Sequence, residues 1–285
     1  MDSLLFYELL SLFFLYAFLG WCGEVSFHAL VTGRFVNRGF LNGPLCPIYG
    51  IGVVAVVFLL EPVKEDTLLL FLASLLLTSL LELLTGLLLE KLFHARWWDY
   101  SKEPFHLGPY ICLKFSLMWG FACVFVVSFI HPFVLLCIGL LPPLMGKLLM
   151  AVLSAAMAAD CYVTVASVTH MLRRLEGLEK LAAEIESISD RIGERISEST
   201  LEVVERQRQG KARAAEYKDE LHHKLEESKE QLMDRLEDVK AEFQRRLSEH
   251  GLGQRRILKA FPHLRSLRHH RVLQALRQAI HLKRR

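Results

Sequence analysis

The chain has 285 residues, of which 52% are hydrophobic and 23% charged, and its formal net charge at pH 7 is +3. This mild total conceals three blocks of different charge: residues 1–170 carry 8 Lys/Arg and 11 Asp/Glu, residues 171–253 carry 16 and 20, and residues 254–285 carry 10 and none. The blocks indicate a membrane domain, a charged helical region and a basic tail, which excludes one uniformly charged soluble domain.

Five stretches are apolar over about the 20 residues that a helix needs to cross the hydrocarbon core of a bilayer. They are residues 4–30, 41–60, 67–90, 111–130 and 143–170. No basic residue precedes the first stretch, which is also too long for the core of a signal peptide, so we expect a retained helix. The sequence therefore predicts an all-α membrane helix bundle with about five spans.

The stretch between the last two spans, residues 131–143, contains an apolar run bounded by Pro132 and by Pro142 and Pro143. The run has about 10 residues and is too short to span a bilayer. We expect a lip or re-entrant turn here, and a sixth span is the alternative.

Basic residues alternate along the loops between the predicted spans. Lys and Arg occur in the first and third loops and after the fifth span, whereas the second loop is mostly acidic and the fourth is nearly uncharged. By the positive-inside rule, the N-terminus lies outside and the C-terminus in the cytoplasm of a multi-pass protein of the cell membrane.

Polar residues recur at one depth in these spans. Three spans each carry a carboxylate in the half nearer the cytoplasm, and a carboxylate that faces lipid costs several kcal/mol, so we expect the three to face the bundle interior. We predict a polar cavity open to the cytoplasm. Its candidate substrate-binding residues are Glu24, Glu82, Asp160, Asn42, Tyr49 and Trp21. The alternative is that these groups only hydrogen-bond helices to one another.

The third loop reads "HARWWDYSKEPFHLGPY", from His94 to Tyr110. Its aromatic residues fit an interfacial belt, which is the simpler interpretation. An acid between aromatic rings, followed by two prolines, favours instead a folded loop that covers the cavity mouth. The candidate gate residues are Arg38, Trp97, Trp98, Asp99 and Tyr100.

Four motifs within residues 1 to about 170 resemble one bacterial membrane family, the putative ABC-transporter permease type IV family (CmpB-like). They are "GWCGE" (20–24), "NRGFLNGPLCPIYG" (37–50), "LELLTGLLLEKLFHARWWDYS" (81–101) and "ICLKFSLMWG" (111–120). The resemblance implies a polytopic protein of the cytoplasmic membrane and, through the family label, transport. Family sequences usually carry "PFNLNGR" before "ICL", whereas this chain has "PFHLGPY", so an arginine of that motif is missing.

Heptad-like spacing of apolar residues predicts helical pairing after the membrane domain. The seam consists of Leu178, Leu181, Ile185, Ile188 and Ile192, and then of Leu225, Leu232, Leu236, Val239 and Phe243, with an interruption near Gly210. Both a helical hairpin and an oligomeric coiled coil fit it, so residues 172–250 are expected to pair with themselves or with a homo-oligomer or helical partner.

The basic tail, residues 254–285, has apolar residues at near-helical spacing, namely Leu264, Leu267, Leu273, Leu276 and Ile280. A basic amphipathic helix beside a bilayer most simply binds anionic lipid head groups. Nucleic acid is the disfavoured alternative, because the tail shows no aromatic interleaving and no recognised motif.

Two functions fit the sequence. The first is a transporter permease-like subunit that binds a small solute or cation through Glu24 and Glu82, and the second is a membrane-anchored scaffold or signalling protein that acts through its cytoplasmic arm. The chain has no G-x-x-x-x-G-K-[ST] phosphate loop, so an ATPase would be a separate subunit. We expect no enzymatic activity, since no Ser/His/Asp or H-E-x-x-H arrangement is present. We also expect no metal and no cofactor, because the six cysteines form no C-x-x-C pair and no histidine cluster has zinc-like spacing.

Overall fold

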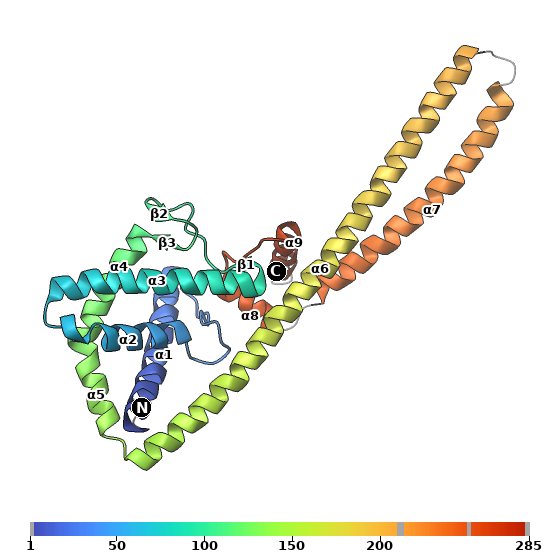
Figure 1. Cartoon of the computed structure of the whole chain (residues 1–285). Helices are drawn as coiled ribbons and strands as arrows, with labels where there is room; N and C mark the ends of the chain where they lie inside the picture. Colours follow the sequence, from blue (N-terminus) through green and yellow to red (C-terminus); the bar gives the residue numbers. More distant parts are fainter. Residues whose placement is uncertain (1–2, 210–213, 250–251, 283–285) are drawn as a thin grey trace. The chain divides into compact units, whose positions relative to one another are not determined.

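The computed structural model describes residues 3–209, 214–249 and 252–282. The chain divides into two compact units: Met1–Met171 with Gly251–Arg268, and Leu172–His250 with His269–Arg285. Most of the described residues are helical and few lie in strands (Figure 1), which confirms the predicted all-α membrane bundle.

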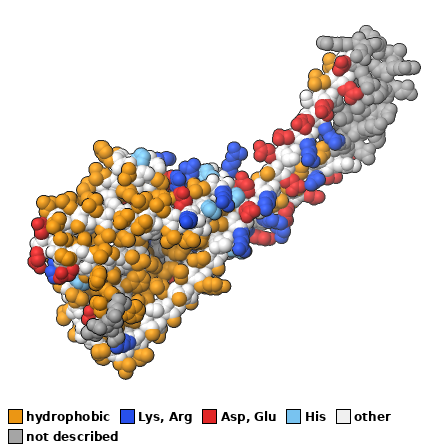
Figure 2. All heavy atoms as spheres, viewed as in Figure 1, with side chains coloured by type: hydrophobic (Ala, Val, Ile, Leu, Met, Phe, Trp, Pro, Cys, Tyr) orange, Lys and Arg blue, Asp and Glu red, His pale blue; other side chains and the backbone are white. Residues whose placement is uncertain are grey.

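Four helices are long and apolar enough to cross a membrane: Leu5–Thr32, Thr67–Phe93, Leu113–Gly139 and the first part of Pro143–Glu202. The first two correspond to α1 (Ser3–Thr32) and α3 (Thr67–Phe93), and the last lies in α6 (Pro143–Gln209). Figure 2 shows hydrophobic side chains over most of the visible surface of these helices. Exposed residues such as Leu76, Phe129 and Leu148 suit contact with lipid.

The second predicted span, residues 41–60, is not a continuous helix. Helix α2 covers only Pro47–Leu59, and its 13 residues reach about 20 Å against a hydrocarbon core of about 30 Å. The preceding residues 33–46, called the first loop below, are not helical. Proline at the start of α2 lacks the N–H that would continue a helix backwards, which explains the late beginning.

The first loop nevertheless runs along the second half of α1. Its last residue, Cys46, donates its backbone N–H to the carbonyl of Ala17, near the middle of α1, at 2.9 Å. Farther along α2, Gly50 lies against Phe13 of the first half of α1. Helix α2 is therefore antiparallel to α1, and loop and helix together accompany most of its length.

The prediction of a lip or re-entrant turn at residues 131–143 is wrong. Helix α4 (Leu113–Phe125) continues through a π-helical segment, η2 (Val126–Ile130), into α5 (His131–Gly139). Pro132 cannot donate to the carbonyl one turn earlier, and wider π-helical spacing accommodates such a residue without ending the helix. The fourth span is thus longer than predicted, and residues 131–139 form no separate sixth span.

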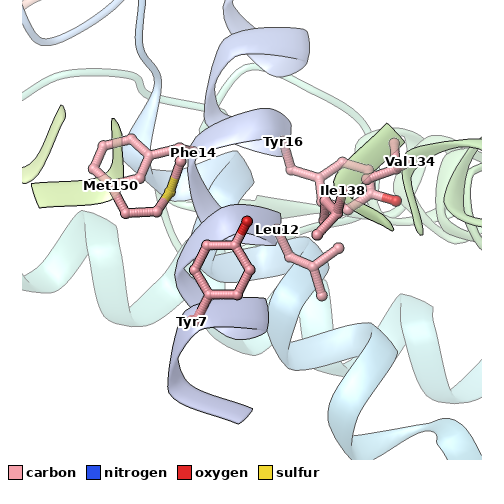
Figure 3. Close-up of a cluster of buried hydrophobic side chains, with 7 residues drawn as sticks. All are labelled: Tyr7, Leu12, Phe14, Tyr16, Val134, Ile138 and Met150. Atoms are coloured by element: carbon pink, nitrogen blue, oxygen red, sulfur yellow. The ribbon is translucent and has the colours of Figure 1, made fainter. Parts of the chain in front are cut away.

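A hydrophobic cluster holds α1 against the end of the fourth span and the start of α6. Figure 3 shows its seven buried side chains, which are Tyr7, Leu12, Phe14, Tyr16, Val134, Ile138 and Met150. The hydroxyl oxygen of Tyr16 also lies 3.0 Å from Nδ1 of His131. The cluster fixes α1 in the bundle, and α1 carries the first of the predicted site acids.

The third loop, residues 94–112, contains three short strands. β2 (His106–Leu107) and β3 (Ile111–Cys112) form an antiparallel pair, and β1 (Ala95–Arg96) pairs with β4 (Arg265–Ser266). β4 follows α8 (Leu252–Ala260), and we call residues 252–268 the returning segment because they rejoin the first unit. The chain's basic end therefore does not form one helix, and its first half packs against the third loop.

The second unit contains a hairpin made by α6 and α7 (Ala214–Ser248). Arg235 of α7 pairs with Glu184 of α6 at 2.9 Å, and Arg174 of α6 donates to the carbonyl of Arg246. Leu178 and Ile188 of α6 and Leu236 of α7 are buried, so these seam residues pack against other groups of the same chain, and pairing with a second chain stays a prediction. The turn near Gly210 and the side chain of Leu225 lie outside the described residues.

Helix α9 (His270–Leu282) also belongs to the second unit. Its Val272, Leu273 and Leu276 are buried, whereas Leu264 of the returning segment is buried in the first unit. Ile280 lies among the residues whose side chains are not described. Much of the tail's apolar surface thus has a protein partner, and its binding to anionic lipid stays a prediction.

Candidate functional site

Glu24 of α1 meets Tyr49 of α2. The tyrosine hydroxyl donates a 2.5 Å hydrogen bond to Oε1 of the carboxylate. One turn before Glu24, Gly20 leaves room for the tyrosine, because a Cβ there would lie 2.4 Å from the Cβ of Tyr49. Trp119 of α4 contacts the other side of the ring at 5.5 Å between centroids. The sequence placed Glu24 and Tyr49 at one depth, and the structure joins them directly.

Arg38 of the first loop approaches the other oxygen of the same carboxylate. Its Nε lies 3.8 Å from Oε2 of Glu24, and both side chains are about 30% exposed or less. Its Nη1 donates at 2.5 Å to the carbonyl of Ala260, the last residue of α8. A residue predicted as a gate therefore contacts the predicted site acid and the returning segment together.

Glu82 of α3 is held in the same way by a tyrosine from the third loop. The hydroxyl of Tyr100 donates to Oε1 of Glu82 at 3.0 Å. The ring of Tyr100 stacks on Phe115 of α4, with centroids 4.8 Å apart. The second oxygen, Oε2, is buried and has no hydrogen-bond partner among the described residues, which leaves an acceptor available inside the bundle.

The two acid–tyrosine pairs lie close enough to influence each other. Burial raises the pKa of Tyr100 above its ordinary value, and the charge of Glu82 raises it further. Glu24 contributes in the same direction, although its own tyrosine is Tyr49. Tyr49 packs against Trp119 and Tyr100 against Phe115, and these two rings lie one turn apart on α4, so both pairs lie beside the same part of that helix. A shared substrate site between them stays a prediction.

Asp160 of α6 binds the backbone of the first loop. Its carboxylate accepts from the N–H of Asn42 at 3.0 Å and from the N–H of Gly43 at 2.6 Å. The Asn42 amide adds a bond to Oδ1 at 2.8 Å and another to the hydroxyl of Thr164 at 2.9 Å. These contacts satisfy polar groups of a non-helical segment among apolar helices. The substrate role of Asp160 and Asn42 stays a prediction.

Trp21 also serves the first loop. Its indole N–H donates to Oδ1 of Asn37 at 2.8 Å, and the same oxygen accepts from the N–H of Gly39 at 3.0 Å. The amide of Asn37 then donates to the carbonyl of Asn42 at 2.7 Å. Asn37 was missed in the sequence, although the Asn-rich turn chemistry of "NRGFLNG" was a usable signal.

The predicted gate residues of the third loop have different surroundings. Trp97 is buried, with its ring against Phe40, Phe93 and Phe261. Asp99 accepts the N–H of Ser101 at 3.0 Å, a local turn contact. Of the third-loop candidates, Tyr100 alone is described with a bond to a predicted site acid, and a gating role for the group stays a prediction.

Trp98 leads to a cluster that the sequence did not predict. Its indole N–H donates at 3.4 Å to the carbonyl of Tyr110, whose hydroxyl binds Glu90. Arg96 pairs with the same carboxylate at 2.8 Å, and the ring of Tyr110 fills the space left by Gly86. Tyr110 stands where the resembling motif "PFNLNGR" has its arginine.

Arg256 of α8 is a second residue that the sequence did not indicate. Its guanidinium donates to three consecutive carbonyls of the first loop: Gly39 at 3.0 Å, Phe40 at 2.7 Å and Leu41 at 2.9 Å. No local pattern identifies this role, because the contact joins residues more than 200 positions apart. Among the described residues, no group of three His, Cys, Asp or Glu side chains could hold a metal ion.

A comparison with family models matches residues 11–165 to the family described as putative ABC-transporter type IV. The matched region is more than half of the chain and contains both acid–tyrosine pairs. Comparisons with curated proteins and with solved structures found no match.

Proposed function

This chain belongs to the putative ABC-transporter type IV family, and from that premise we propose that it is a permease-like membrane subunit that binds a small cation or polar solute between Glu24 and Glu82. The observation that carries the proposal is that the pairs Glu24–Tyr49 and Glu82–Tyr100 pack, through their tyrosines, against successive turns of α4. Carboxylates within apolar helices are costly, and they commonly mark ion or substrate pathways.

The unpartnered Oε2 of Glu82 supports a ligand that donates a hydrogen bond or carries positive charge. Arg38 neutralises part of the charge of Glu24 in the absence of such a ligand. A cation that enters between the pairs would compete with Arg38 for one oxygen and engage the free oxygen of Glu82.

The proposed topology has five crossing segments, with the N-terminus outside. The second is discontinuous, because it combines the first loop with α2. The first loop, the third loop and the returning segment meet around Phe40, Trp97 and Phe261. All three segments contain basic residues, and their contact at one end of the bundle supports placing the basic loops on one side of the membrane. By the positive-inside rule, that side is the cytoplasm.

A separate ATPase subunit is the partner that this function requires. The sequence has no phosphate-binding loop of its own. The cytoplasmic end of the bundle is the surface from which such a subunit would drive transport.

Ligand binding is testable on the purified full chain. Melting temperatures are measured with NaCl, KCl, MgCl2 and choline chloride at matched ionic strength, for the wild type, Glu24→Gln and Glu82→Gln. We expect one cation to raise the melting temperature of the wild type and of Glu8→Gln, a control at an exposed helical carboxylate, and to lose that effect in both site variants. Equal shifts in all four proteins would refute the site.

A scaffold function is the second candidate, and the α6–α7 hairpin favours it. The part of the hairpin in the second unit, from Leu172 onward, lies outside the matched residues and has many exposed charged side chains, which suits a partner-binding arm. Glu184 faces Arg235, so replacing residues 188–231 by a short Gly/Ser turn should shorten the arm in register and keep the returning segment. A permease should retain its ligand-induced stabilisation in this variant, whereas a scaffold should lose its cellular function.

A further inference from the structure

The returning segment packs onto the two loops that carry site residues. Phe261 lies edge-on to Trp97, with centroids 4.7 Å apart, and β4 continues the contact by pairing with β1. The N–H of Leu267 donates to the carbonyl of His94 at 3.1 Å. Leu264 and Ile257 are buried in the same unit. The segment is thus an integral part of the first unit, although it lies outside the matched family region.

Arg256 makes the first loop depend on this packing. The carbonyls of Gly39, Phe40 and Leu41 have a common donor in its guanidinium. Burial lowers the pKa of Arg256, and the charge of Asp160 opposes that change. A planar guanidinium can serve several acceptors at fixed angles, which a lysine ammonium cannot do. The first loop is therefore held at two successive stretches of backbone, by Arg256 at residues 39–41 and by Asp160 at residues 42–43.

Arg38 connects the first loop, as held by Arg256, to the candidate site. It immediately precedes the three carbonyls, and it divides its guanidinium between Oε2 of Glu24 and the carbonyl of Ala260. The last carbonyls of a helix lack partners within the helix and favour a cation. The C-terminus of α8 therefore helps to hold Arg38 where it reaches Glu24.

We propose that the returning segment is a latch that positions Arg38 against Glu24, so that its release changes the charge balance of the site. This inference rests on the proposed function, because Glu24 is a ligand-binding residue only under that function. The chain on both sides of the segment belongs to the second unit. An event on the cytoplasmic arm can thus act on the segment through the backbone and, through Arg38, on the affinity for a cation.

The test measures Glu24 directly and needs no ligand. The purified full chain is treated with dicyclohexylcarbodiimide, which modifies carboxyl groups in apolar surroundings, and the rates at Glu24 and Glu82 are followed by mass spectrometry. We expect Arg38→Gln and Arg256→Gln to speed modification of Glu24 about fivefold relative to Glu82, which corresponds to about 1 kcal/mol. Arg256→Lys should recover only part of the wild-type rate, and Lys259→Gln, at an exposed position of α8, should leave it unchanged.

Phe261→Ala tests the latch by another contact, in case Arg256→Gln fails to fold. It removes one of the three rings packed against Trp97. The contribution of Trp97 to the emission, taken as the difference between proteins with and without Trp97→Phe, reports undocking. Faster modification of Glu24 together with a red-shifted emission supports the latch. Acceleration in Arg38→Gln alone, or in none of the variants, overturns it. Ligand-induced stabilisation that persists in Glu24→Gln would refute the proposed function and leave this result intact.

Discussion

The backbone N–H of Gly43 donates a 2.6 Å hydrogen bond to Oδ2 of Asp160, and a Cβ on Gly43 would lie 3.1 Å from the same oxygen. The absence of a side chain at position 43 thus lets the first loop approach α6 closely enough for a carboxylate to bind its backbone. The contact joins residues 117 positions apart. It explains how a non-helical segment is maintained between helices that are otherwise apolar.

Replacing Asp160 by Ala should destabilise the membrane domain. Four hydrogen bonds to Asn42, Gly43 and Thr164 are lost, and the N–H groups are left without an acceptor. We expect a cost of about 2–3 kcal/mol, visible as a fall of several degrees in melting temperature. Asp160→Asn should lose less, because it keeps one oxygen acceptor. Glu65→Ala, at an exposed position, is the control, and an equal effect there would contradict the argument.

Gly20→Ala should disturb the site more than Gly23→Ala. A Cβ at Gly20 would lie 2.4 Å from Tyr49, whereas a Cβ at Gly23 meets nothing within 4 Å. Overpacking costs about 1–3 kcal/mol, while alanine in an open helical position stabilises by up to about 1 kcal/mol. Melting temperatures should therefore move in opposite directions for the two variants. A matched response would show that Tyr49 does not depend on Gly20.

Tyr100→Phe should leave both carboxylate oxygens of Glu82 without a hydrogen-bond donor. We expect it to weaken the proposed cation site, and to do so only by its effect on Glu82. The hydroxyl is the donor that Oε1 uses among the described residues. In a double-mutant cycle with Glu82→Gln, we expect a coupling of about 1 kcal/mol in melting or cation-binding free energy. Tyr162→Phe, at an exposed tyrosine, should be neutral. If the free-energy effects of Tyr100→Phe and Glu82→Gln simply add in the double variant, Tyr100 and Glu82 do not interact as proposed.

The seam of residues 172–250 should close within one chain. Cysteines introduced at Glu184 and Arg235, in a protein without its native cysteines, replace two side chains that now pair at 2.9 Å. A flexible bis-maleimide cross-linker should give an internally cross-linked monomer on a denaturing gel, because a contact between two long side chains leaves the backbones too far apart for a direct disulfide. Glu184→Cys combined with Glu230→Cys is the mismatched control. Cross-linked dimers as the main product would indicate pairing between chains instead.

The apolar runs predicted the long helices well, because membrane insertion depends on local hydrophobicity and length. The second and fourth spans show where this reasoning fails. A run of apolar residues after Pro47 indicates a helix, yet nothing in the run itself shows that the six residues before it fold as a loop against α1. Conversely, Pro132 was interpreted as a boundary, whereas a π-helical turn absorbs its missing hydrogen bond within one continuous span.

The candidate site likewise combines features that the local sequence predicts with contacts that it does not predict. The sequence names Glu24, Glu82 and Tyr49 as candidates, because a carboxylate in an apolar helix is expected to face other protein groups, and the structure shows such contacts for all three. Their role in binding a substrate stays a prediction. Arg256 and the Ala260 carbonyl could not be found, since their contacts with the first loop arise only after the chain returns from the α6–α7 hairpin. The sequence by itself determined an all-helical membrane protein, and the common depth of three acids within it stays a prediction. Only the tertiary structure decided which donors meet those acids and the first loop, because backbone groups in a non-helical segment take whatever partner the completed fold brings to them.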